Sequence, residues 1–519
     1  MIKNMRAEEK TNVRNSITRV FFAGLLFALQ VYWIVLVAIR LNRYSTAIAA
    51  ITGLLALILA LRINSGNENA AFKMPWIILI LVFPVFGICV FFLFGRRGAT
   101  KRDGERFGAE HKRWMGFLKQ DPKVMDALEE TDLYAANQFR YLSRQEGYPV
   151  FQNTQVKFYD FAEKGIEDQL LELEKAETYI FMEYHAIEEG QSFGRIMKIL
   201  EKKAAQGVEV RILYDDVGSV GFLNLDFIKR MKEKNIQCRV FNPVFPVLKI
   251  FMNNRDHRKI TIIDGKVGFT GGYNLADEYF NLTHPYGTWK DTGIRLEGDG
   301  VDSLLTMFLE MWNGFGNSAK DTSGQPYFAK DKGRNCEGGF VQPYADSPLD
   351  DRQVGENVYL NLIKGAKRFL YITTPYLIIS DEMRRELTQA AERGVDVRIV
   401  TPGIPDKKMV FRVTRSYYAG LVKGGVRIYE YTPGFIHSKQ MTADGEYGVV
   451  GTINLDYRSL YHHFENGVLL YDCPAVKDMV QDFHQTFQAS KEVTKEYEGE
   501  RYAAVRGFDC LLRLAAPLL

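Results

Sequence analysis

Near its start the chain contains three long runs without a charged side chain. These runs cover residues 20–39, 44–61 and 76–94. A helix of about 20 apolar residues spans the roughly 30 Å hydrocarbon core of a bilayer. Pro84 interrupts the third run, but membrane helices tolerate proline. The pattern therefore predicts two or three transmembrane helices within residues 1–98 and a multi-pass protein of the cell membrane.

The orientation of these helices depends on the flanking charges. Basic residues cluster before the first run, within 3–19, and again after the last run, within 96–106. The positive-inside rule places both clusters in the cytoplasm, which an odd number of spans cannot do. We leave the choice between two and three spans open. The interpretation favours a catalytic part on the cytoplasmic side.

Beyond the apolar region, the pattern changes twice. Residues 99–149 are charged and helix-like, which indicates a connector. From residue 150 onward, short apolar strands alternate with helical periodicity: 176–184 reads as a buried strand, and Gly207 ends a helix before the next strand at 208–214. The same order returns at 366–376, 380–392 and 395–400.

This repetition predicts an α/β fold in which two tandem halves are related by a pseudo-twofold axis. The first half covers residues 150–330 and the second covers 331–519. The second half includes a C-terminal amphipathic tail near 511–516, which either lies on the membrane or closes the fold.

Charge and cysteine content narrow the function classes. The chain has 519 residues, and its net charge of +3 does not mark a nucleic-acid-binding protein, which would show a concentrated basic face. The five cysteines are scattered and lack C-x-x-C spacing, so neither a disulfide framework nor a zinc site is indicated.

The chemistry is concentrated in a motif that occurs twice. A histidine is followed by lysine two positions later, aspartate after five more, a glycine turn, and asparagine, and the second copy begins 180 positions after the first. Two copies in register favour a duplicated active-site half over a pair of incidental surface histidines. The residues are His257, Lys259, Asp264 and Asn274 in the first copy and His437, Lys439, Asp444 and Asn454 in the second.

The duplicated HxKx4Dx6GxxN frame resembles the phospholipase D superfamily. Apolar runs ahead of two such frames, together with the segment 454–459 and the strand end at 374–376, resemble bacterial cardiolipin synthases within it. The resemblance implies a phosphatidyltransferase that converts two phosphatidylglycerol molecules into cardiolipin and glycerol. Its partners are these lipids and the bilayer, with no cofactor, no metal and no nucleic acid. The oligomeric state stays open.

The resemblance also leaves other functions to be distinguished. A phospholipase D that hydrolyses its lipid would release phosphatidic acid, because water would then replace the lipid hydroxyl. A nuclease of the same fold is disfavoured by the apolar runs and by the lack of a basic groove with interleaved aromatic residues. A non-enzymatic membrane scaffold is disfavoured because both frames are intact.

Two histidines suit transfer at a phosphodiester. One attacks phosphorus to form a phosphohistidine, and the other protonates the leaving oxygen and then deprotonates the incoming hydroxyl. The superfamily's usual assignment implies that His257 is the nucleophile and His437 the acid and base, although the sequence itself does not separate them. A nucleophilic imidazole also needs a carboxylate on its other nitrogen, and Asp291 and Glu465 are the candidates for this second shell.

The remaining frame residues have supporting roles. Lys259 and Lys439 lie two positions after their histidines and therefore on the same side of a strand, where they can stabilise phosphoryl oxygens. Asn274 and Asn454 are expected to donate hydrogen bonds to the same oxygens. Asp264 is expected to hold the hairpin turn of the first copy rather than to contact substrate, and Asp444 is expected to do the same in the second copy.

Three other features have ordinary interpretations. The segment 190–194 matches G-x-S-x-G, but Ser192 precedes a helical pattern and is interpreted as an N-cap rather than a nucleophile. His463, close to Glu465, suggests a metal site, but too few ligands are present in sequence. His185 is interpreted as a structural histidine.

Overall fold

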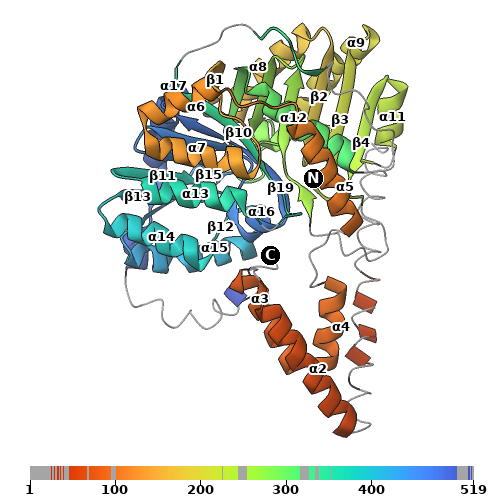
Figure 1. The fold of residues 1–519 in the computed structure, drawn as a ribbon, viewed down its shortest axis with the longest axis vertical. Coiled ribbons are helices and arrows are strands. Elements are labelled where there is room, and N and C mark those ends of the chain that lie inside the picture. The colour runs from red at the N-terminus through yellow and green to blue at the C-terminus, as the bar shows by residue number, and fades with distance from the viewer. Residues whose placement is uncertain are drawn as a thin grey trace.

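The protein consists of two α/β halves from which a group of N-terminal helices projects (Figure 1). The computed structural model describes residues 46–66, 69–94, 101–224, 226–243, 254–315, 327–332, 338–350 and 352–498. It also describes positions 25, 28, 29, 32, 33, 35, 36, 39, 512–514 and 516.

The first half is built on a seven-stranded mixed sheet with the order β1-β9-β7-β6-β2-β3-β4. Strands β2, β3 and β4 run parallel, and the remaining pairs are antiparallel. The strands are β1 (Thr154–Tyr159), β2 (Tyr179–Tyr184), β3 (Glu209–Asp215), β4 (Ile236–Phe241), β6 (Lys259–Ile263), β7 (Val267–Gly271) and β9 (Gly293–Gly298). The helices are α8 (Ala162–Lys175), α9 (Gln191–Ala205), α10 (Asp216–Ser219), α11 (Phe227–Glu233), η3 (Asp277–Phe280) and α12 (Val301–Gly314).

The second half repeats this topology strand for strand. Its sheet has the order β10-β19-β17-β16-β11-β13-β14 and adds β20 at the far edge. The strands are β10 (Phe340–Asp346), β11 (Phe369–Thr373), β12 (Leu377–Ile378), β13 (Asp396–Pro402), β14 (Arg427–Tyr431), β16 (Gln440–Ala443), β17 (Tyr447–Gly451), β18 (Leu455–Asp456), β19 (His463–Tyr471) and β20 (Ser490–Glu492). The helices are α13 (Val354–Gly365), α14 (Asp381–Glu392), α15 (Lys408–Lys423), α16 (Tyr457–Tyr461), α17 (Pro474–Gln488) and α18 (Thr494–Tyr497). The α/β fold with two related halves is therefore confirmed.

One apolar core joins the halves. Helix α12 is buried along nearly its whole length, and its side chains belong to the same core cluster as residues of β10, β17 and β19. The Asn466 amide also donates to Thr270 Oγ1 at 2.8 Å, which links β19 to β7. The relative position of the two sheets is thus fixed by burial as well as by polar contacts.

Three helices form the connector between the apolar region and the halves: α5 (Lys101–Met115), α6 (Pro122–Thr131) and α7 (Leu133–Gln145). They bury Trp114 and Phe139 completely. The buried Gln342 amide of β10 donates to the carbonyls of Phe139 and Tyr148 at 3.1 and 2.7 Å. These contacts tie the connector to the second half, although the exact domain boundaries stay a prediction.

The N-terminal helices differ from the expected spans. They are α2 (Thr46–Asn64), α3 (Ala70–Val82) and α4 (Pro84–Phe94), and within the described part of the chain no helix is both long and apolar enough to cross a membrane. The run 76–94 is two helices rather than one, because Pro84 lacks an N–H and excludes its predecessor Phe83 from helical geometry. The first run, 20–39, lies largely outside the described residues.

Helix α3 and the described C-terminal residues both pack against the second half. The ring centroid of Phe72 in α3 lies 5.3 Å from that of Tyr457 and 5.0 Å from that of Tyr461. At the other end, Arg513 donates to Ser416 and lies 4.4 Å above the Tyr417 ring. The described part of the C-terminal tail therefore closes the fold.

Candidate active site

Each motif histidine follows a short strand that pairs with the opposite half. Strand β5 (Arg255–Asp256) runs parallel to the start of β19, and β15 (Gly434–Ile436) runs parallel to β8 (Thr288–Lys290). The His257 N–H donates to the Phe464 carbonyl at 2.9 Å, and the His437 N–H donates to the Lys290 carbonyl at 2.7 Å. These pairings bring the two histidines to one cavity between the halves.

The same strand pairings place a carboxylate of each half beside the motif histidine of the other half. Glu465, from the second half, lies 2.9 Å from His257 Nδ1 through both of its oxygens. Asp291, from the first half, lies 2.6 Å from His437 Nδ1. Because a carboxylate can only accept, we assign the proton of each ring to Nδ1. Each Nε2 is then left for the cavity.

Each lysine lies two positions after its histidine, and residues two apart in an extended chain point to the same side. The ammonium of Lys259 donates to the His257 carbonyl at 2.5 Å, and the ammonium of Lys439 donates to the His437 carbonyl. Lys439 Nζ also lies 2.8 Å from His437 Nδ1, but this nitrogen directs its proton to Asp291 and cannot accept from an ammonium. Arg258 points the opposite way, into the core, where it pairs with Glu310 at 2.9 Å.

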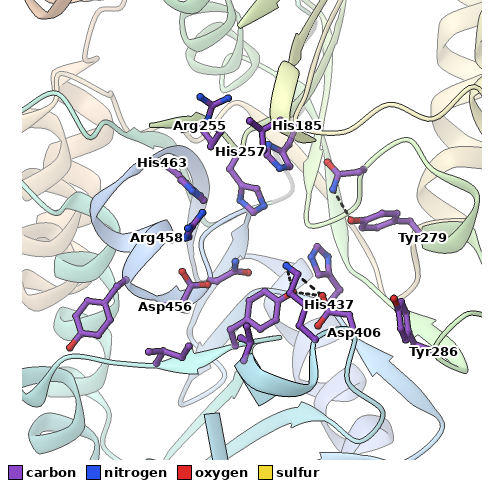
Figure 2. Close-up of a pocket in the computed structure, with 18 of the residues that line it drawn as sticks. His185, Arg255, His257, Tyr279, Tyr286, Asp406, His437, Asp456, Arg458 and His463 are labelled. Atoms are coloured by element: carbon purple, nitrogen blue, oxygen red, sulfur yellow. Dashed lines mark hydrogen bonds and ion pairs between the residues drawn. The ribbon is translucent and has the colours of Figure 1, made fainter. Parts of the chain in front are cut away.

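The cavity has a volume of about 480 Å³ and is lined by residues of both halves. Around His257 it is basic, with His185, Arg255, Arg458 and His463 (Figure 2). Around His437 it is aromatic and acidic. Its lining there includes Glu278, Tyr279, Tyr286, Trp289, Tyr376 and Asp406. A cavity of this size can hold a lipid headgroup.

Burial disfavours the charged form of all four motif bases. It lowers the pKa of His257 well below its usual range, and the charge of Lys259 adds to this effect. Burial also lowers the pKa of His437 to about 4, with Lys439 adding to the effect. The lysines are affected in the same direction, since burial lowers the pKa of Lys259 to about 8 and that of Lys439 to about 7.

The Asp291–His437 pair has one apparent inconsistency. Although burial alone would raise it, the pKa of Asp291 is lowered because His437 and Lys439 favour the carboxylate. A charged His437 would be needed for the full effect, whereas the lowered pKa of His437 describes a neutral ring. The 2.6 Å contact fits a neutral His437 that donates its Nδ1–H to an ionised Asp291.

The motif aspartates hold the turns and do not reach the cavity. Asp264 accepts from the N–H groups of Glu177, Thr178 and Tyr179, each at 2.8 Å. These hydrogen bonds lower the pKa of Asp264, although burial opposes them. Asp444 makes the equivalent contacts with the three N–H groups at residues 367–369, at 2.7–3.1 Å. Both aspartates adopt positive φ angles, 53° and 58°, as the D-G turns require.

The two asparagines line the cavity but are held differently. Asn274 donates to Tyr279 Oη at 2.8 Å and accepts from the Ala186 N–H at 3.1 Å. Asn454 Oδ1 is buried and has no hydrogen-bond partner among the described residues. Both asparagines line the same cavity as the two histidines, and of the two only Asn454 has an unused amide oxygen among the described residues.

Several residues of the site were not predicted. The His185 ring lies 5.0 Å from that of His257, so the structural interpretation was incomplete, even though His185 Nδ1 does bond to the Asp256 carbonyl at 2.7 Å. Ser192 is not an N-cap: it lies inside α9 and donates to Asp277, the first residue of η3, which caps α9 by accepting from the N–H groups of Gln191 and Ser192. The only sequence signal for Arg255 and Arg458 was that each is a basic residue close to one of the two motifs.

A group of possible metal ligands overlaps the site. His257, His463 and Glu465 offer three donor atoms within 4.8 Å of one another. The positive charges of Arg255 and Arg458 lie at the same end of the cavity, however, and they favour an anion there over a divalent cation. The residues thus fit a phosphate better than a metal ion.

Comparisons with known proteins agree with this geometry. The family model "Cardiolipin synthase, PLD-like domain" matches residues 170–291 and 359–487, and the model "Phospholipase_D-nuclease N-terminal" matches residues 51–96. Cardiolipin synthase 2 of Bacillus cereus is 32% identical over 87% of this chain and 88% of its own. Cardiolipin synthase 1 of Staphylococcus aureus is 33% identical over 91% of this chain and 97% of its own.

A solved structure supports the fold alone. Phosphatidylserine synthase of Haemophilus influenzae superposes with a TM-score of 0.55 at 15% identity, covering 72% of this chain and 98% of that chain. The family predicted from the repeated H-x-K frame is confirmed by the sequence relatives, since identity above 30% extends over most of both chains. This chain belongs to the cardiolipin synthase family of phospholipase D-like proteins.

Proposed function

We propose that the protein transfers a phosphatidyl group from one phosphatidylglycerol molecule to another, giving cardiolipin and glycerol. The observation that carries this proposal is the pair of crossed histidine–carboxylate contacts at 2.9 and 2.6 Å, which face one cavity with two buried lysines. Two relatives that span most of the chain carry the name cardiolipin synthase and support the choice of substrate.

The surroundings of the two histidines support different roles for them. Burial, with the charge of Lys259 adding to its effect, lowers the pKa of His257 and keeps the ring neutral, so its Nε2 is a free base that can attack phosphorus. Burial also lowers the pKa of His437, but there the contact with Asp291 opposes the lowering and favours the protonated ring. We therefore assign His257 as the nucleophile and His437 as the general acid and base.

The reaction then has two balanced steps. In the first, His257 Nε2 forms a bond to phosphorus while the bond from phosphorus to the glycerol oxygen breaks, and His437 Nε2 gives that oxygen its proton. In the second, His437 takes a proton from a hydroxyl of the acceptor lipid, whose oxygen bonds to phosphorus as the P–N bond breaks. His257 returns to its starting state, and no cofactor takes part.

The lysines prepare the site for an anion. An entering phosphodiester offsets the repulsion between Lys259 and Lys439 and thereby raises the pKa values of both lysines and of His437. The lysines then hold the non-bridging oxygens as charge develops in the transition state. Asn274 and Asn454 are placed to complete this shell. Asp264 and Asp444 act only on the turns.

The apolar helices suit a lipid substrate. Helices α2 and α3 leave large apolar side chains uncovered, among them Ile51 and Leu61 at 59% and 61% exposure. Helix α3 contacts α16, whose Tyr457 and Arg458 line the cavity. We propose that this region anchors the chain in the cell membrane, with the catalytic part on the cytoplasmic face, and delivers lipid to the cavity.

The test uses purified protein with phosphatidylglycerol in mixed micelles containing a chelator. Cardiolipin and glycerol should form in a one-to-one ratio, and His257→Ala and His437→Ala should each abolish both products. Phosphatidic acid as the main product would identify a hydrolase. Loss of activity on chelation, restored by metal ion, would contradict the metal-free mechanism.

A further inference from the structure

The two ends of the cavity differ in charge although the halves that form it are related. The His257 end carries four basic side chains, with the carboxylate of Asp456 beside Arg458 (Figure 2). The His437 end carries two carboxylates, Glu278 and Asp406, together with Lys407 and a group of aromatic rings. A pseudo-twofold relation would make both ends alike. The difference indicates that the two ends bind different parts of the substrate.

Aromatic rings surround His437. The ring centroids of Tyr279, Trp289 and Phe435 lie 5.3, 5.4 and 5.9 Å from that of His437. Trp289 is only 4% exposed, and its indole Nε1 has no hydrogen-bond partner among the described residues. These rings give this end of the cavity a largely apolar wall on which the carbon–hydrogen face of a ligand can pack.

Two carboxylates, one from each half, complete this end. Glu278 belongs to η3, and within the described part of the chain its carboxylate has neither a hydrogen bond nor an ion pair. Burial and the nearby Glu188 and Asp406 raise the pKa of Glu278 to about 7. Asp406 accepts from Tyr376 Oη at 2.5 Å, which leaves its other oxygen for a ligand.

We propose that Glu278, Asp406 and the surrounding aromatic rings form a polyol subsite that binds the glycerol headgroup. The proposal rests on the function given above. In-line displacement places the leaving oxygen opposite His257, beside His437, so the rest of the glycerol must occupy this end. Its two remaining hydroxyls donate to the carboxylates, and its carbon–hydrogen face packs on the rings.

The same end selects the acceptor. The incoming hydroxyl must take the position of the leaving oxygen, so the headgroup of the second phosphatidylglycerol occupies the same subsite. Carboxylates there repel anionic headgroups. Lys407, whose Nζ lies 3.8 Å from Asp406 and 5.3 Å from the Tyr376 ring centroid, already occupies the position of a cation and disfavours an ammonium headgroup.

The experiment is a competition between headgroups. Full-length protein is given equimolar phosphatidylglycerol and phosphatidylethanolamine in mixed micelles, and the release of glycerol and of ethanolamine is measured separately. Wild type should prefer glycerol. Glu278→Gln and Asp406→Asn should each reduce kcat/KM for glycerol release about 10- to 100-fold, as expected for loss of one charged hydrogen bond, while leaving ethanolamine release within about threefold.

Matched controls separate the outcomes. Glu189→Gln removes a carboxylate whose partner is Arg230 on the surface, and it should leave both rates unchanged. Continued ethanolamine release shows that a variant is folded. Glycerol preference that survives both subsite variants, or a wild type that does not prefer glycerol, overturns the subsite. Preferential glycerol release with phosphatidic acid as product supports the subsite while overturning the transferase.

Discussion

Replacing each orienting carboxylate by its amide should distinguish the nucleophile from the acid. Asp291→Asn removes a charge-assisted hydrogen bond of 2.6 Å to His437. Such a bond contributes about 1.5–3 kcal/mol, which corresponds to a roughly 10- to 160-fold loss in kcat. If the new amide donates to Nδ1 and fixes the wrong tautomer, the loss extends toward about 10⁴-fold. Glu465→Gln should produce a loss of similar size through His257.

The two variants should differ once the leaving group no longer needs a proton. With a phosphatidyl ester of p-nitrophenol, the phenolate leaves without help from His437. Asp291→Asn should then show a rapid burst of nitrophenol near the wild-type rate, followed by slow turnover, because the second step still needs a base. Glu465→Gln weakens the nucleophile itself and should show the same loss with both substrates.

The assay is stopped-flow absorbance for the burst and acid quench for the covalent phosphatidyl-enzyme. Thr452→Val is the control for Glu465→Gln, because it removes only the hydroxyl that donates to Glu465 and retains the carboxylate. Recovery of Glu465→Gln by the activated ester, with none for Asp291→Asn, would refute the assignment and exchange the roles of the two histidines.

Three further changes test other parts of the site. kcat/KM requires neutral His257 together with charged His437 and charged Lys439, whose pKa values in the free protein are about 4 and about 7. It should therefore fall as pH rises above about 4 and fall more steeply above about 7, and a slower Lys439→Arg variant should lose the steeper fall; a profile that rises above pH 7 would contradict this. Asp264→Ala leaves three N–H groups without an acceptor and should lower the free energy of unfolding, measured by calorimetry, by roughly 1–3 kcal/mol. The kcat of the folded enzyme should be nearly unchanged, and a large loss of kcat would give Asp264 a chemical role. Gly272→Ala would place its Cβ against an oxygen of Asp291, closer than van der Waals contact allows, and should therefore lower kcat on phosphatidylglycerol as much as Asp291→Asn does. Wild-type activity would mean that the Asp291–His437 pair tolerates displacement.

The periodicity of the sequence was sufficient for the fold class. Alternating strands and helices, repeated after the connector, predicted two related α/β halves because a strand's side-chain period of two and a helix's period of 3.6 are local properties. The D-G turns were also local, and both hairpins are present. The division at Phe83 was not predicted, since an apolar run with an internal proline fits a membrane helix equally well.

The site could be predicted only as far as its motifs reached. The sequence identified Asp291 and Glu465, but it could not show that each carboxylate serves the histidine of the other half. This crossing depends on the short strands β5, β8 and β15, and the two histidine–carboxylate contacts span 208 and 146 positions of sequence. Ser192 was misassigned for the same reason, because its helix is capped by Asp277, 85 positions away.

The exchanged carboxylates also bear on how such a chain could have arisen. A single half contains one histidine and one carboxylate that do not contact each other, so a half-length ancestor would have needed a second copy to complete either pair. Fusion of two such copies into one chain would make that dimer permanent and allow the copies to diverge. Gly272 beside Asp291 and Thr452 donating to Glu465 are products of this divergence at equivalent positions. In this way an enzyme that uses two identical lipid molecules could acquire a cavity whose two ends differ.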